Sequence, residues 1–241
     1  MGITFPSLSY AAHVAIKASA AATTAPTTFS LGHVREALAA ALGYNTYAAL
    51  KAAMGAGEEP VSYDGAQHVV IDVQRLTARL AGLGHGQSFG IVAAAIQQAF
   101  ESLLPEAKLH DSVSDLGDHL YAEIVDAIEN SEGYSSELAM TNAYGGDFDL
   151  EFSEPVLIDA AKGTWTLSVD GTSSLEQDSD KVFHGDTINV TARVVFQKIG
   201  RRVLGEMSIE DAGGSIQYLG EPMDDEPFDF EPDGDEGGAH V

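Results

Sequence analysis

A long stretch in which apolar and polar residues alternate, Asp147–Tyr218, constrains the fold of this chain more than any other feature. A period of two is typical of β-strands that bury one face and expose the other. The apolar positions that share a face are Phe148, Leu150 and Phe152, then Trp165, Leu167 and Val169, then Ile188, Val190, Ala192, Val194 and Phe196, and finally Met207 and Ile209. This pattern predicts an antiparallel sheet with one face toward solvent.

The residues before this stretch predict helices, which we expect to cover the buried face of the sheet. Apolar residues recur there at helical spacing, and the expected helices span 7–22, 30–42, 46–54, 72–82, 88–104 and 113–130, with a further turn within 133–142. The only tryptophan, Trp165, is expected to be buried against helix 88–104 or helix 113–130. The fold class that these elements predict is α+β.

Changes in composition divide the chain into three parts. Residues 1–57 are expected to form a small helical module, and 58–220 an α+β domain with helices in 67–142 and the curved antiparallel sheet in 147–219. Residues 221–241 carry three prolines and no periodicity, which predicts a disordered tail. The 241 residues, 44% of them hydrophobic, are enough for a proper core.

Several polar residues and glycines stand where helices should begin or end. Ser7, Ser30, Asn45, Asp72 and Ser88 are each expected to cap a helix N-terminus. Gly43 is placed to end the helix before it in a left-handed conformation. The triplet Tyr144-Gly145-Gly146, directly before the first long strand, predicts a hinge or a bulge.

The run Ser30-Leu-Gly-His-Val-Arg-Glu-Ala-Leu-Ala-Ala-Ala-Leu-Gly-Tyr-Asn-Thr-Tyr-Ala-Ala-Leu-Lys-Ala resembles a known small helical module. The module belongs to uncharacterised bacterial proteins, many of them borne on plasmids or integrative elements, and some are labelled "glyoxalase-related". Further similarity runs through His68–Asp72 with Arg79, and through Met140–Asn142. The resemblance implies a bacterial host and a mobile-element setting. It implies no glyoxalase activity, because the duplicated βαβββ pattern of metal-binding glyoxalases is absent.

The sequence indicates a cytoplasmic protein. It contains no cysteine, so neither a disulfide framework nor a thiolate metal site is possible. No apolar run is long enough to span a bilayer. His13 and Lys17 interrupt the only apolar stretch that could serve as a secretory signal, and Pro6 stands where a myristoylation signal needs Ser or Thr.

The net charge of −25, from 12 basic and 37 acidic residues, is distributed unevenly. Residues 1–57 have a net charge of +2, whereas 111–148 and 221–241 each hold nine acids and no base. Such a surface repels free nucleic acid and attracts a basic protein, for example one whose basic site normally holds nucleic acid. The sequence favours a non-enzymatic interaction protein, a regulator, inhibitor or immunity-type binder. The alternative role for the charge is to keep the protein soluble.

Apolar residues among the acids of the tail are candidates for binding that partner. Apolar anchors in an acidic disordered segment dock into basic grooves in many proteins, and the tail also resembles, in composition, the acidic tails of bacterial single-strand-binding proteins. The candidate partner-binding residues are Met223, Asp224, Asp225, Phe228 and Phe230.

The other candidate site is an acidic helix that could hold a divalent metal. Asp115, Asp118, His119 and Glu123 fall within 113–130, and His119 and Glu123 are one helical turn apart; a further ligand would come from elsewhere, such as His110. A hydrolase or lyase that uses this helix is the alternative function. The acids fall opposite the buried face, so a solvated helix face is favoured, and no metal, catalytic or cofactor site is assigned.

Three further motifs are read as turns. The Gly43-Tyr44-Asn45 junction could belong to a DNA-reading helix-turn-helix, but the second helix offers only Lys51 as a base. The glycines in 82–86 lack the preceding strand and the lysine of a phosphate loop. His184-Gly185-Asp186, with Asp178 and Asp180 nearby, could supply a general base, although a hairpin turn is favoured.

Overall fold

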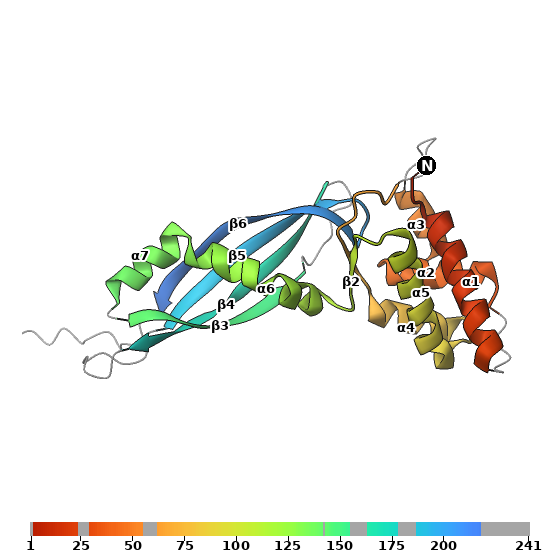
Figure 1. Cartoon of the computed structure of the whole chain (residues 1–241), viewed down its shortest axis with the longest axis horizontal. Coiled ribbons are helices and arrows are strands. Elements are labelled where there is room, and N and C mark those ends of the chain that lie inside the picture. Colours follow the sequence, from red (N-terminus) through yellow and green to blue (C-terminus); the bar gives the residue numbers. More distant parts are fainter. Residues whose placement is uncertain are drawn as a thin grey trace, which may run out of the picture.

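The computed structural model describes residues 2–23, 29–54, 62–141, 143–154, 163–177 and 187–217. The molecule is elongated, with five helices gathered at one end and a curved sheet with two helices at the other (Figure 1). The two regions are called here the helical end and the sheet end. The expected α+β class is confirmed. None of the described helices has the length and apolar character needed to cross a membrane.

Five α-helices and one short 3-10 helix build the helical end. They are α1 (Phe5–Thr23), α2 (Leu31–Ala41), α3 (Tyr47–Ala53), α4 (Val73–Gly82), η1 (Gly86–Ser88) and α5 (Phe89–Leu103). Helix α1 begins two residues before the expected Ser7, because Pro6 fits the first turn of a helix, where its missing N–H would have no partner. Its buried face carries Leu8, Ala12 and Ile16, while Val14 is exposed.

Two of the five expected caps are confirmed, and Ser7 lies inside α1. Ser30 and Asp72 accept hydrogen bonds from the backbone N–H groups of the third residue after each, and so cap α2 and α4. Thr46, not Asn45, caps α3, since the side chain of Asn45 accepts a hydrogen bond from Arg75 instead. Ser88 lies in η1 and makes no capping hydrogen bond with its side chain.

The sheet is mixed, which corrects the expectation of a purely antiparallel one. Its strands are β1 (His68–Val70), β2 (Lys108–His110), β3 (Ala143–Ser153), β4 (Thr164–Gln177), β5 (Thr187–Lys198) and β6 (Val203–Gln217). They lie in the order β2-β1-β6-β5-β4-β3. The last four are antiparallel, as expected, but β1 and β2 pair in parallel and β1 joins the sheet beside β6.

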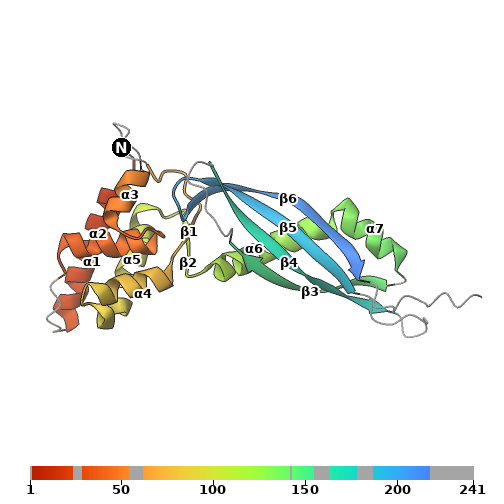
Figure 2. The same ribbon diagram turned by 180° about the vertical axis from the view of Figure 1, so that it is seen from behind.

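The alternation predicts the covered face of the long strands correctly. Trp165 and the apolar positions of β5 are buried, and those of β3 are half-buried. The register between β3 and β4 shifts between Tyr144 and Asp147, which confirms the expected bulge at the two glycines. Figure 2 shows the face of the long strands opposite to the buried one, over which none of the described helices lies.

Helices α6 (Val113–Glu129) and α7 (Glu132–Met140) cover the face of the sheet that carries Trp165 and the buried apolar side chains of β5. Leu116, Leu120, Ile124 and Ile128 of α6 share one buried cluster with Trp165. The indole of Trp165 is 1% exposed and meets the ring of Phe196 edge-on. Trp165 therefore packs on the α6 side, which is one of the two arrangements expected.

Helix α5 does not cover the sheet, contrary to the expectation for residues 88–104. It packs against α1, and Val92, Ile96 and Phe100 join a second buried cluster made mostly by α1 to α5. An amphipathic stripe indicates that a helix packs against an apolar surface, but it does not indicate which surface. This cluster draws residues from both sides of position 57, and the boundary expected there stays a prediction.

A loop between β5 and β6 joins the two ends. The guanidinium of Arg201 donates to the carbonyl oxygen of Gly43 at 3.2 Å and lies over the ring of Tyr44. Gly43 has a φ of +83°, as its expected left-handed role requires, and a Cβ there would lie 3.1 Å from the Arg201 side chain. Arg202 lies between two carboxylates, 2.8 Å from Glu154 and 3.7 Å from Asp72.

Candidate functional site

An acidic surface covers α6, α7 and β3. Residues 111–154 contain twelve acids and neither lysine nor arginine. Eleven of the twelve are exposed, and the acidic surface is defined here by them: Asp111, Asp115, Asp118, Glu123, Asp126, Glu129, Glu132, Asp147, Asp149, Glu151 and Glu154. Among the described residues, the ion pairs of this set involve only Glu154 with Arg202 and Asp115 with His110. Most of the charge therefore has no internal counterion there.

Helix α6 lies close to the outer strand β3, whose acids alternate with Phe148, Leu150 and Phe152 and so face away from the helix at the same edge of the sheet. A Cβ at Gly117 would lie 2.2 Å from the ring of Phe152, so only glycine permits this approach. The hydroxyl of Tyr121 donates to the carbonyl oxygen of Phe148 at 2.7 Å. Partial burial raises the pKa of Tyr121, and the carboxylates of Asp147 and Asp149 raise it further. The contribution of Asp147 and Asp149 to this shift indicates that the carboxylates of β3 lie near the hydroxyl of Tyr121.

Three histidines meet where β1, β2 and α6 come together. His68 is 7% exposed and His110 is 3% exposed, and Nδ1 of His68 lies 3.1 Å from Nε2 of His110. The ring of His119 lies 5.8 Å from that of His68 and 5.4 Å from that of His110, centroid to centroid. Nδ1 of His110 faces the carboxylate of Asp115 at 3.5 Å. When the proton of neutral His110 is on Nδ1, its Nε2 can accept a hydrogen bond from the Nδ1–H of His68.

The environment of these histidines keeps the buried pair neutral at pH 7. Burial, with His110, His119 and Lys108 adding to it, lowers the pKa of His68 to about 4. Burial also lowers the pKa of His110, against the opposing effect of Asp115. The pair therefore acts as a polar contact between β1 and β2 and adds no positive charge beside the acidic surface.

The structure brings together only part of the metal set expected on the acidic helix. Asp115 and His119 lie at the histidine cluster, with His110 as the residue from elsewhere. All four residues of the expected set are exposed, but among the described residues neither Asp118 nor Glu123 makes a hydrogen bond or ion pair with the cluster. Within the described ranges, no three His, Asp or Glu side chains are arranged so that they could hold a metal ion. His68 was missed by sequence reasoning. Its only signal is its place two residues before Val70, which puts both side chains on the same face of a strand.

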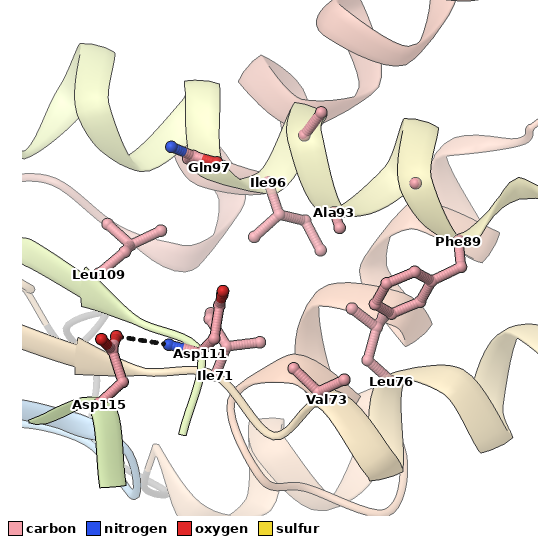
Figure 3. Close-up of a pocket in the computed structure, with 12 residues that line it drawn as sticks. Ile71, Val73, Leu76, Phe89, Ala93, Ile96, Gln97, Leu109, Asp111 and Asp115 are labelled. Atoms are coloured by element: carbon pink, nitrogen blue, oxygen red, sulfur yellow. Dashed lines mark hydrogen bonds between the residues drawn. The ribbon is translucent and has the colours of Figure 1, made fainter. Parts of the chain in front are cut away.

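A hollow of about 670 Å³ lies on the other side of β1 and β2, between α4 and α5 (Figure 3). Its walls are mostly apolar, and one end carries Asp111 and Asp115. The backbone N–H of Asp111 donates to a carboxylate oxygen of Asp115 at 3.1 Å.

The remaining candidate residues lie outside the described part of the chain. These are the partner-binding set Met223, Asp224, Asp225, Phe228 and Phe230, and the possible general base His184 with Asp178, Asp180 and Asp186. Their roles stay predictions. The expected turn at 82–86 is present as the end of α4 and the start of η1, with Gly84 at a φ of +78°.

Comparison of the chain with protein-family models, with curated proteins and with solved structures finds no match. The function therefore has to be argued from the residues and their arrangement.

Proposed function

We propose that this protein is a non-enzymatic binding protein that captures a basic surface of another protein through its acidic surface. The observation that carries the proposal is the accumulation of eleven exposed acids over α6, α7 and β3 with almost no counterions of their own. Like charges held this close repel one another and destabilise the compact state. A complementary basic partner relieves that repulsion and is drawn in at an increased rate.

The chemistry of the partner follows from the sign and density of the charge. Free nucleic acid is repelled, whereas a protein whose basic site normally holds nucleic acid presents the opposite potential. The mobile-element setting implied by the resemblance of 30–52 is consistent with a regulator, inhibitor or immunity-type binder. The tail at 221–241 adds nine more acids, and Phe228 and Phe230 are proposed to prolong the complex by filling apolar pockets.

The alternative, a divalent-metal hydrolase or lyase, needs at least three ligands around one point, and the described part of the chain contains no such group.

The test is affinity isolation from a bacterial lysate at roughly 50 and 200 mM salt, followed by binding kinetics with the partner that it identifies. Replacing Asp147 and Asp149 with Asn is expected to slow association by about threefold at the lower salt and to flatten the salt dependence. The matched control replaces Glu101 and Glu106 with Gln. It removes the same charge from exposed positions outside the acidic surface.

Equal effects of the two double variants would show that only total charge matters and that the acidic surface is a solubility device. A partner that is captured equally well at both salt concentrations would also contradict the proposal. Replacing Phe228 and Phe230 with Ala is expected to shorten the residence time at unchanged net charge.

A further inference from the structure

The hollow between α4 and α5 has the size and the place of a ligand site. Its volume of about 670 Å³ falls in the range that small-molecule sites occupy. Strands β1 and β2 are parallel neighbours, and α4 and α5 form the crossover that connects them. The hollow opens at the carboxyl ends of both strands, where Ile71 and Asp111 follow them. Ligands of α/β units bind outside the carboxyl ends of parallel strands.

The walls of the hollow are apolar over most of their length. Figure 3 shows Phe89 at one end, with side chains of α4 and α5 facing each other between it and the acids. Ile71, Leu76 and Ile96 are buried, whereas Val73, Phe89, Ala93 and Leu109 are left half-exposed around the opening. An apolar ligand group about the size of a short alkyl chain or a single aromatic ring would cover this half-exposed lining.

The opposite end offers mainly hydrogen-bond acceptors. Asp111 and Asp115 are both exposed, and within the described residues no lysine or arginine pairs with either of them. His110, whose Nδ1 lies 3.5 Å from the carboxylate of Asp115, has a lowered pKa and is neutral at pH 7. The amide nitrogen of Gln97 donates to Glu101, which leaves its carbonyl oxygen to accept. A ligand group that satisfies this end must be a donor and carries positive charge.

We propose that this hollow binds a small organic cation, namely an aryl or alkyl amine whose ammonium group pairs with Asp111 and Asp115 and whose apolar body lies against Phe89, Val73 and Leu109. The acidic tail cannot be the occupant on grounds of charge, because residues 221–241 contain no base. Asp111 and Asp115 also belong to the acidic surface, but the other residues of the hollow do not, so the amine proposal is tested at the hollow itself.

The test is a titration of the full-length chain with phenethylamine and with hexylamine, followed by two-dimensional NMR and calorimetry. Binding with a dissociation constant on the order of 1 mM is expected for ligands of this size. The neutral isostere 2-phenylethanol is expected to bind at least about tenfold more weakly, since it lacks the charge.

Variants locate the site. Asp111→Asn is expected to weaken phenethylamine binding by about tenfold, because it removes a charge-assisted contact and keeps the size of the side chain. The matched control Asp118→Asn, an exposed acid of α6 outside the hollow, is expected to leave binding unchanged. Ala93→Phe is expected to abolish binding by filling the space between the walls, and far-UV circular dichroism confirms that each variant is folded.

Failure of both amines to bind would overturn the proposal. Equal affinity for 2-phenylethanol, or equal losses in Asp111→Asn and Asp118→Asn, would also overturn it, since binding would then owe nothing to the acids of this hollow. The salt-dependent capture of a basic protein can succeed or fail whatever the outcome of this titration, so the two proposals fail separately.

Discussion

The helical end and the sheet end bury apolar surface with different side chains. Nine alanines lie in the buried cluster of the helical end, whereas the cluster of the sheet end contains only Ala192. Small residues let helices approach closely, at axis separations of about 8 Å. The space between a sheet and its covering helix needs larger side chains, and Trp165, Phe196 and the branched residues of β5 and α6 supply them.

The N-terminal and C-terminal parts of the sequence also differ in charge. Residues 1–110 contain six bases and seven acids, a net charge of −1, whereas 111–241 contain six bases and thirty acids, a net charge of −24. A protein that needed charge only for solubility could carry it on either end. The segregation of charge is what the proposed capture of a basic partner by the acidic surface requires, whereas solubility alone does not require it.

The largest expected effect tests the sheet core. Trp165→Ala should lower the free energy of unfolding by about 3–5 kcal/mol, because it removes a fully buried ring and leaves a cavity beside Phe196. Urea denaturation followed by circular dichroism measures the loss. The native protein should also fluoresce at short wavelength, and a red-shifted, water-like emission would contradict the burial of Trp165.

The next effect tests how closely α6 approaches the sheet. Gly117→Ala should cost about 1–3 kcal/mol, since its Cβ would overlap the ring of Phe152. The same change at Gly82, the last residue of α4, meets nothing within 4 Å and should be neutral or slightly stabilising. If both variants had the same stability, the tight contact at Gly117 would be wrong.

A smaller effect tests the histidines between the two ends. His68 has a pKa of about 4 in the folded chain and about 6.5 in the unfolded one, so the unfolded state takes up the proton first as the pH falls. Stability is therefore complete above pH 6.5 and is lost progressively as the pH approaches 4.

Between pH 7 and pH 5 the loss should be about 1 kcal/mol after allowance for partial solvent screening. It is measured by urea denaturation at each pH. His68→Gln, which keeps hydrogen-bonding atoms but cannot titrate, should show a flatter dependence over this interval. Parallel curves for the two proteins would assign the pH dependence to other groups.

The smallest effect concerns the tail. Deleting residues 221–241 should change the free energy of unfolding by less than about 0.5 kcal/mol, because the composition of this segment predicts that it buries no core. Differential scanning calorimetry of the full chain and the truncated chain makes the comparison. A clear drop in melting temperature would show that the tail packs on the folded part.

The sequence predicts the features that depend on local spacing. The period of two places Trp165 on the covered face, and the local chemistry of Ser30, Gly43 and Asp72 sets the ends of their helices. Strands β1 and β2 were not predicted, since three residues are too few to show a period. The partner of α5 was not predicted either, since its stripe matches any apolar surface.

The candidate site likewise has one part that the sequence predicts and another part that it does not. The acidic surface follows from the absence of bases in 111–154, which any reading of the sequence shows. The histidine cluster and the hollow proposed to bind amines do not follow from the sequence. They depend on the parallel pairing of β1 and β2, which aligns His68 with Lys108 and Val70 with His110, residues that are forty positions apart in the chain.

The outer strand of the sheet also affects how copies of this protein behave toward one another. Strand β3 ends the sheet, and within the described residues no strand pairs with its outer side. Asp147, Asp149 and Glu151 occupy every second position along it. If two molecules joined these edges into one continuous sheet, carboxylates would stand about 5 Å apart across the new ladder. At neutral pH and high concentration, two molecules therefore repel each other at the strand edge where intermolecular β-pairing would otherwise start. Protonation of these carboxylates at acidic pH removes the repulsion that prevents such pairing.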